Sequence, residues 1–191
     1  MRIKEVKVYK FNELNDKAKR YAIDKYREHD DFSHSADYVI EDATAIGKLM
    51  GIDIEKIYYS GFCSQGDGAC FIGNYHYRED SMKLVKEYAP VDERLHDIAL
   101  LFDLCKGVSA KIKHPGHYYH SGCMDISVYS EHDDGYVKSK EDEILVDALK
   151  AYADWIYRSL EKEYEYQNSD VIIIAGIAAN DYEFLENGRM E

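Results

Sequence analysis

Two runs of β-branched and aromatic residues flank a short glycine-containing loop in the first half of the chain. The runs cover residues 55–63 and 69–77, and residues 64–68 between them read Ser-Gln-Gly-Asp-Gly. Such runs favour extended strands, and glycine and aspartate are typical of the tight connection between two strands. The sequence therefore predicts a β-hairpin in which Gly66 and Gly68 adopt positive φ and Asp67 closes the turn through its side chain.

A second pair of strands is predicted further along the chain. Residues 108–114 and 118–130 alternate between apolar and polar positions, and a His-Pro-Gly-His sequence at 114–117 joins them. Shorter strands are expected at residues 2–9 and 182–184, the latter followed by a turn at Asn187-Gly188.

Apolar residues at helical spacing predict five amphipathic helices, which cover residues 16–29, 36–50, 81–88, 93–105 and 140–166, with a break and a new cap at Ser33 to Ser35. Asn15 is placed to cap the first helix and Gly51 to end the second, whose apolar stripe includes Tyr38. Residues 170–180 fit either a buried strand or a helix, because periodicity does not separate the two. We favour a helix with Asn180 as a left-handed cap, since the segment is long and contains alanines.

Together these elements predict an α+β fold. We expect a single domain over residues 1–191, in which an antiparallel sheet of two hairpins packs against amphipathic helices on one face. No apolar run approaches the ~18 residues of a membrane span, and residues 1–5 lack the apolar region of a secretory signal. The four cysteines show no disulfide pattern, so we expect free thiols and a cytoplasmic protein.

The chain is acidic, with a formal net charge of -13, and the charge is uneven. Residues 111–191 contain 8 basic and 17 acidic residues, a net charge of -9. Such a chain is repelled by nucleic-acid backbones, so we expect no direct binding to nucleic acid. The acidity serves either solubility or contact with a basic protein. The 18 tyrosines suit either core packing or an interface.

The histidines and cysteines are the residues of this chain best suited to a metal or a nucleophilic site. His117, His120 and Cys123 have residue types that suit zinc. On a strand, however, His120 points away from the other two, so they share an ion only if the strand breaks at Ser121-Gly122. We therefore expect no metal and no cofactor. Cys63 in its loop, or Cys123 near His117 and His120, suits a Cys/His pair. We do not favour one, because a reactive thiol needs a positive environment, whereas nothing basic flanks Cys63 and Asp67 opposes its ionisation.

Several motifs resemble those of a family of small proteins encoded by bacteriophages and prophages. They are Ser-Gly-Phe-x-Ser-Gln-Gly-Asp-Gly-Ala-Cys-Phe at residues 60–71 and shorter motifs at 11–19, 120–124 and 180–188. The resemblance implies a protein that works in the bacterial host cytoplasm during infection or lysogeny. It implies no particular enzymatic activity.

From these observations we expect a non-enzymatic phage or prophage accessory protein that binds a host protein. It would act as an acidic inhibitor of a nucleic-acid-binding defence or regulatory protein, with no membrane association. The candidate binding residues are Ser64, Gln65, Asp67, His117, His120, Glu141, Asp142 and Glu143. The alternative is a small hydrolase or transferase with a site between loop 64–68 and segment 114–121. That alternative requires Gln65, Asp67, His117 and His120 to converge.

Overall fold

The computed structural model describes residues 5–29, 32–114, 116–130 and 139–191. Contacts within the chain divide it into two compact units, one of Asp37–Glu161 and one of Met1–Ala36 with Lys162–Glu191. The predicted α+β class is confirmed, whereas the single domain over residues 1–191 stays a prediction.

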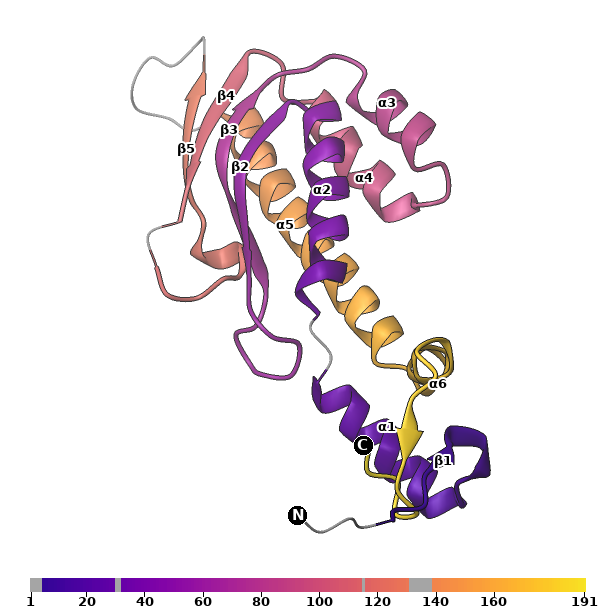
Figure 1. Cartoon of the computed structure of the whole chain (residues 1–191). Helices are drawn as coiled ribbons and strands as arrows, with labels where there is room; N and C mark the ends of the chain where they lie inside the picture. Colours follow the sequence, from indigo (N-terminus) through magenta and orange to yellow (C-terminus); the bar gives the residue numbers. More distant parts are fainter. Residues whose placement is uncertain (1–4, 30–31, 115, 131–138) are drawn as a thin grey trace. The chain divides into compact units, whose positions relative to one another are not determined.

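The unit Asp37–Glu161 is built on a four-stranded antiparallel sheet with the strand order β2-β3-β4-β5. The strands are β2 (Ile52–Tyr59), β3 (Ala69–His76), β4 (Val108–Lys113) and β5 (Asp125–Ser130). The helices are α2 (Ser33–Leu49), α3 (Ser81–Tyr88), α4 (Glu93–Asp103) and α5 (Lys140–Gln167), of which α2 and α5 continue beyond this unit. Figure 1 shows the helices on one side of the sheet, as the sequence predicts.

The core of this unit lies between the sheet and the helices. From β3, the Phe71 ring meets Tyr152 of α5 edge-on at 6.1 Å between centroids, and Tyr75 packs against Phe102 of α4 at 5.4 Å. The Tyr152 hydroxyl donates a hydrogen bond to the Ala43 carbonyl of α2. All four aromatic side chains are fully buried, so their apolar area supplies much of the stability of the unit.

The opposite face of the sheet is covered at one end by the connection between β4 and β5. The sequence predicted a short link at 114–117 and a strand from 118, but β5 begins only at Asp125, and a 3-10 turn, η2 (Ser121–Cys123), precedes it. Cys70 alternates with Phe71 along β3 and so points to this face, yet it is fully buried. The connection thus shields apolar surface that the helices do not reach.

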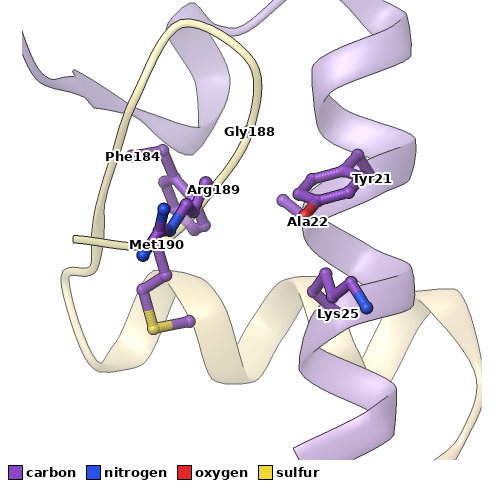
Figure 2. A pocket seen from close by; sticks show the side chains of 7 residues that line it. All are labelled: Tyr21, Ala22, Lys25, Phe184, Gly188, Arg189 and Met190. Atoms are coloured by element: carbon purple, nitrogen blue, oxygen red, sulfur yellow. The ribbon is translucent and has the colours of Figure 1, made fainter.

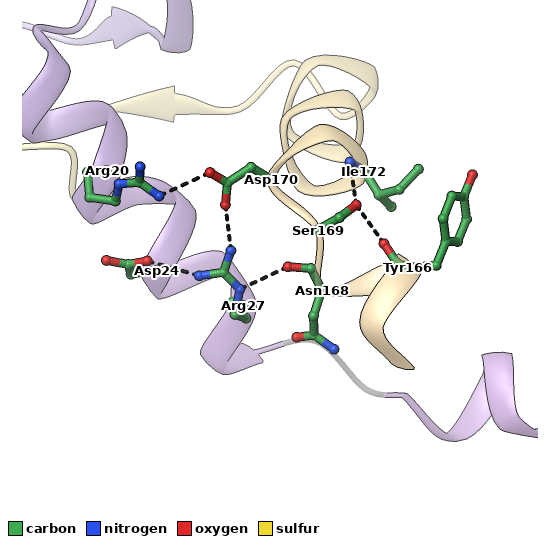
Figure 3. Close-up of polar contacts among 8 residues, drawn as sticks. All are labelled: Arg20, Asp24, Arg27, Tyr166, Asn168, Ser169, Asp170 and Ile172. Atoms are coloured by element: carbon green, nitrogen blue, oxygen red, sulfur yellow. Dashed lines mark hydrogen bonds and ion pairs between the residues drawn. The ribbon is translucent and has the colours of Figure 1, made fainter. Parts of the chain in front are cut away.

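The other unit contains α1 (Asp16–His29), α6 (Asp170–Ala179) and a two-stranded antiparallel sheet of β1 (Tyr9–Lys10) and β6 (Glu183–Phe184), with a 3-10 turn η1 (Phe11–Glu13). Its core consists of Phe11, Leu14, Ala18, Ala22, Ile23, Ile173, Ile177 and Phe184. Figure 3 shows how α1 is tied to the start of α6. Arg20 and Arg27 each bind one carboxylate oxygen of Asp170, at 3.0 and 2.7 Å, and Arg27 Nε donates to the Asn168 carbonyl at 3.1 Å.

The predicted bounds of α1, α3 and α5 are confirmed to within one residue. By contrast, α2 begins at Ser33, before its predicted start, and α4 ends at Asp103 rather than at 105. Asn15 Oδ1 caps α1 by accepting the Ala18 N–H at 3.0 Å, and Gly51 ends α2 with a φ of 82°. The favoured helix at 170–180 is α6, but the left-handed residue is Asp181 rather than Asn180.

The predicted strand at 2–9 is wrong over residues 5–8, which form no strand, and residues 2–4 lie outside the described residues. Pairing starts only at Tyr9 because the partner strand β6 is two residues long. Among the described residues, no helix combines the length and the apolar character that crossing a membrane requires.

Candidate functional site

The loop between β2 and β3 is held by the side chain of Asp67. Its Oδ2 atom accepts the backbone N–H groups of Ser64 at 2.6 Å and Cys63 at 3.0 Å. The hydrogen bond from the Ser64 N–H lowers the pKa of Asp67 most. Those from the Cys63 N–H and the Ser60 hydroxyl lower it further. Asp67 thus closes the turn as predicted, whereas Ser64 and Gln65 are exposed.

The two glycines of this loop serve different purposes. Gly66 has a φ of 103°, as predicted, but Gly68 does not have positive φ. A Cβ atom on Gly68 would lie 2.6 Å from His120 Cβ and 2.8 Å from His120 Cα. Gly68 is therefore required because the β4–β5 connection passes directly against it, so loop 64–68 and segment 114–121 do meet.

The 3-10 turn η2 brings together two side chains that the sequence analysis placed on opposite faces. Cys123 Sγ lies 3.2 Å from His120 Nε2, and both residues are half-buried. The strand prediction was wrong here because a 3-10 turn aligns side chains three positions apart, whereas a strand separates them. The Ser121-Gly122 sequence was the available signal for the break.

The β4–β5 connection also forms an aromatic cluster with β2, and a second cysteine lies near Cys123. Tyr119 stacks on Tyr58 of β2 at 5.5 Å, and both rings lie 5.3 Å from the His114 ring. Both His114 ring nitrogens are buried and have no hydrogen-bond partner among the described residues. Burial raises the pKa of the Cys70 thiol to about 11, and the neighbouring Cys123 contributes in the same direction. Cys70 is therefore an unreactive packed thiol.

The residues that the alternative function required do not all converge. His120 lies at the contact with Gly68, but His117 and Gln65 are exposed and Asp67 is directed into its own loop. What the arrangement offers instead is a thiol beside an imidazole that could accept its proton. The described residues include no group of three or more His, Cys, Asp or Glu side chains placed to hold a metal ion.

The predicted acidic residues of α5 divide into two kinds. Glu141 and Glu143 are exposed. Asp142 instead forms a capping box, because its Oδ2 accepts the Ser139 N–H at 2.9 Å and its own N–H donates to Ser139 Oγ at 3.1 Å. Asp142 therefore stabilises the start of α5, and only its two neighbours are available to a partner.

A second acidic surface was missed from the sequence. The exposed side of α2 carries Asp37, Tyr38, Glu41 and Asp42, and the Tyr88 hydroxyl at the end of α3 donates to Asp42 Oδ1 at 2.6 Å. That hydrogen bond raises the pKa of Tyr88. We call these five residues the acidic tyrosine face.

Tyr38 had been assigned to the buried stripe of its helix, but 75% of it is exposed, and Tyr88 is 51% exposed. The assignment failed because tyrosine suits a half-exposed position as well as a buried one. The spacing of Tyr38, Glu41 and Asp42 along one helix face was the signal that could have found this surface.

One family model matches residues 36–170 of the chain, and that family is described only as a domain of unknown function. The matched segment contains the sheet, the Cys123–His120 pair and the acidic tyrosine face. The curated proteins include no match. The solved structures include none either.

Proposed function

The chain belongs to the family of the domain of unknown function DUF8835, and for this member we propose a non-enzymatic binding role. It is a phage or prophage accessory protein that binds a basic host protein in the bacterial cytoplasm. The target class is a nucleic-acid-binding defence or regulatory protein, whose phosphate-binding surface accepts carboxylates.

The acidic tyrosine face is the observation that supports this role. It combines three exposed carboxylates with two exposed phenol rings. Tyrosine rings supply contact area at low entropic cost, and carboxylates steer a basic partner towards them. The unit that carries the face holds 13 basic and 23 acidic residues, a formal net charge of -10, so the long-range field has the same sign.

Two variants with equal charge changes test the proposal. D37N/E41Q removes two carboxylates from the acidic tyrosine face, and E141Q/E143Q removes two exposed carboxylates from the start of α5. Tagged chains are used to capture host proteins at low and at high salt, with duplex DNA as a competitor. We expect wild type and E141Q/E143Q to retain a basic protein that high salt or DNA releases. D37N/E41Q, alone or with Y38A, should lose it. Equal capture by all variants would contradict the proposal.

A second candidate function follows from the Cys123–His120 pair. In a hydrolase, Nε2 of His120 would take the thiol proton as Cys123 Sγ attacks the carbonyl carbon of an ester. The ester C–O bond would then break, and the alcohol or phenol would leave with the proton that His120 returns. Water, activated by the neutral His120, would hydrolyse the resulting thioester to the free acid and restore the thiol. Hydrolysis of 4-nitrophenyl acetate tests this. We expect C123S and H120Q to abolish turnover and C63S, at an exposed cysteine, to leave it unchanged. Turnover that survives in C123S would exclude this candidate.

A further inference from the structure

A pocket of about 260 Å³ lies between α1 and the C-terminal segment, within the unit formed by the two ends of the chain. Figure 2 shows Tyr21, Ala22 and Lys25 of α1 on one side and Phe184, Arg189 and Met190 on the other. Gly188 completes the lining. Neither the binding role nor the Cys123–His120 pair involves these residues.

The wall formed by the C-terminal segment is fixed by backbone contacts. The Leu185 N–H donates to the Arg189 carbonyl at 2.8 Å, and Phe184 and Met190 form an antiparallel bridge. Gly188 has a φ of 85°, and a Cβ atom there would lie 2.1 Å from the Ala18 carbonyl oxygen of α1. The turn therefore sits directly on α1, and the pocket is formed before any ligand arrives.

The floor of the pocket is apolar, and the space above it is open because α1 has a small residue, alanine, at position 22. Ala22 and Phe184 are buried, at 2% and 0% exposure. A larger side chain at position 22 would occupy the space that the pocket now provides. Tyr21 and Met190, exposed at 41% and 37%, extend the apolar surface towards the opening. Such a floor accepts one aromatic or branched apolar group.

The charged groups of the lining are both cationic. Lys25 is already paired with Glu28, its Nζ lying 2.5 Å from the Glu28 carboxylate. Within the described residues, the Arg189 side chain has no ion pair and no hydrogen bond, whereas its backbone N–H donates to Asn187 Oδ1 at 3.1 Å. A guanidinium binds a carboxylate through two parallel hydrogen bonds, which gives it both affinity and orientation.

We propose that this pocket binds a small carboxylic acid that carries one aromatic or branched apolar group. The apolar group packs between Tyr21 and Met190, over the buried floor of Ala22 and Phe184, and the carboxylate pairs with Arg189. A neutral ligand of the same shape would fill the floor but leave the guanidinium without a partner.

The proposal is tested by titrating the full chain with phenylacetate and, separately, with its neutral analogue phenylacetamide. Amide NMR signals are recorded at each ligand concentration. We expect phenylacetate to shift the Ala22 and Gly188 amide signals in a saturable way. It should bind about tenfold more tightly than phenylacetamide, the gain expected from one charge-assisted pair.

Three variants locate the effect. R189Q should lower phenylacetate binding to the level of phenylacetamide, whereas R94Q, at an exposed arginine of α4, should change neither. A22L should abolish binding of both compounds by filling the floor, and if A22L does not fold, R189Q alone decides. The proposal is overturned if phenylacetate at about 10 mM leaves the pocket signals unmoved. It is equally overturned if acid and amide bind alike, or if R189Q leaves their difference intact.

Discussion

Replacing Gly68 by alanine should separate the β4–β5 connection from the first hairpin. The new Cβ atom would lie 2.6 Å from His120 Cβ, 2.8 Å from His120 Cα and 3.0 Å from the Tyr119 carbonyl oxygen. Ordinary contact begins at 3.4 Å, so His120 Cβ has to move by about 0.8 Å. These atoms belong to the backbone or are bonded directly to it. A side-chain rotation therefore does not relieve the clash, and the connection itself has to shift.

Overpacking of this kind costs about 1–3 kcal/mol of unfolding free energy, and we expect the upper part of that range. Urea unfolding of the full chain measures the loss. Gly61 in the same loop region is the matched control, because a Cβ atom there would meet its nearest neighbour, Asp67 Oδ2, at 3.5 Å. G61A should stay within about 0.5 kcal/mol of wild type. Equal stabilities of G68A and G61A would refute the close packing of the two segments.

Three further predictions concern single side chains. The lowered pKa of Asp67 means that its hydrogen bonds stabilise the fold above the unfolded pKa and are lost as pH falls through the folded value. The stability difference between wild type and D67N in urea unfolding should therefore shrink below about pH 4, and a constant difference would contradict this. Y152F removes a buried hydrogen bond to the α2 backbone and should lower the unfolding free energy by about 1–3 kcal/mol in the same assay. An unchanged unfolding free energy would contradict this and mean that the Ala43 carbonyl has another donor. Burial raises the pKa of Cys70 to about 11 and of Cys105 to about 12, so iodoacetamide at about pH 8 should modify Cys123 before either of them. Mass spectrometry of the modified peptides gives the order, and earlier modification of Cys70 would be inconsistent with its burial.

The sequence predicted the helices and the existence of the first hairpin because their signals are local, although β2 runs over Ile52–Tyr59 rather than over 55–63. A stripe of apolar residues at helical spacing and a cap such as Asn15 act within a few residues of each other, and α1 begins and ends where these signals place it. The loop residue Asp67 was also interpreted correctly, since an aspartate that bonds to its own turn needs no distant partner.

The β4–β5 connection could not be predicted in this way. Alternation over residues 118–130 resembled one strand, but the part before Asp125 covers Cys70, which lies about fifty positions earlier in the chain. Cys70 lies on a face of the sheet only once the strands have paired, so the local sequence of the connection does not show that it has to cover this residue. The same holds for Gly68, whose role depends on contact with His120 rather than on its own φ.

The three proposed sites lie in different parts of the chain relative to the segment that the family model matches. The acidic tyrosine face and the Cys123–His120 pair lie inside the segment that the family model matches, whereas every lining residue of the carboxylate pocket lies outside it. A function common to the whole family has to be carried by the matched segment, because only that segment defines membership. The pocket lies outside that segment, so its ligand binding is separable from such a function. D37N/E41Q should therefore abolish partner capture without altering phenylacetate binding, and R189Q should do the reverse.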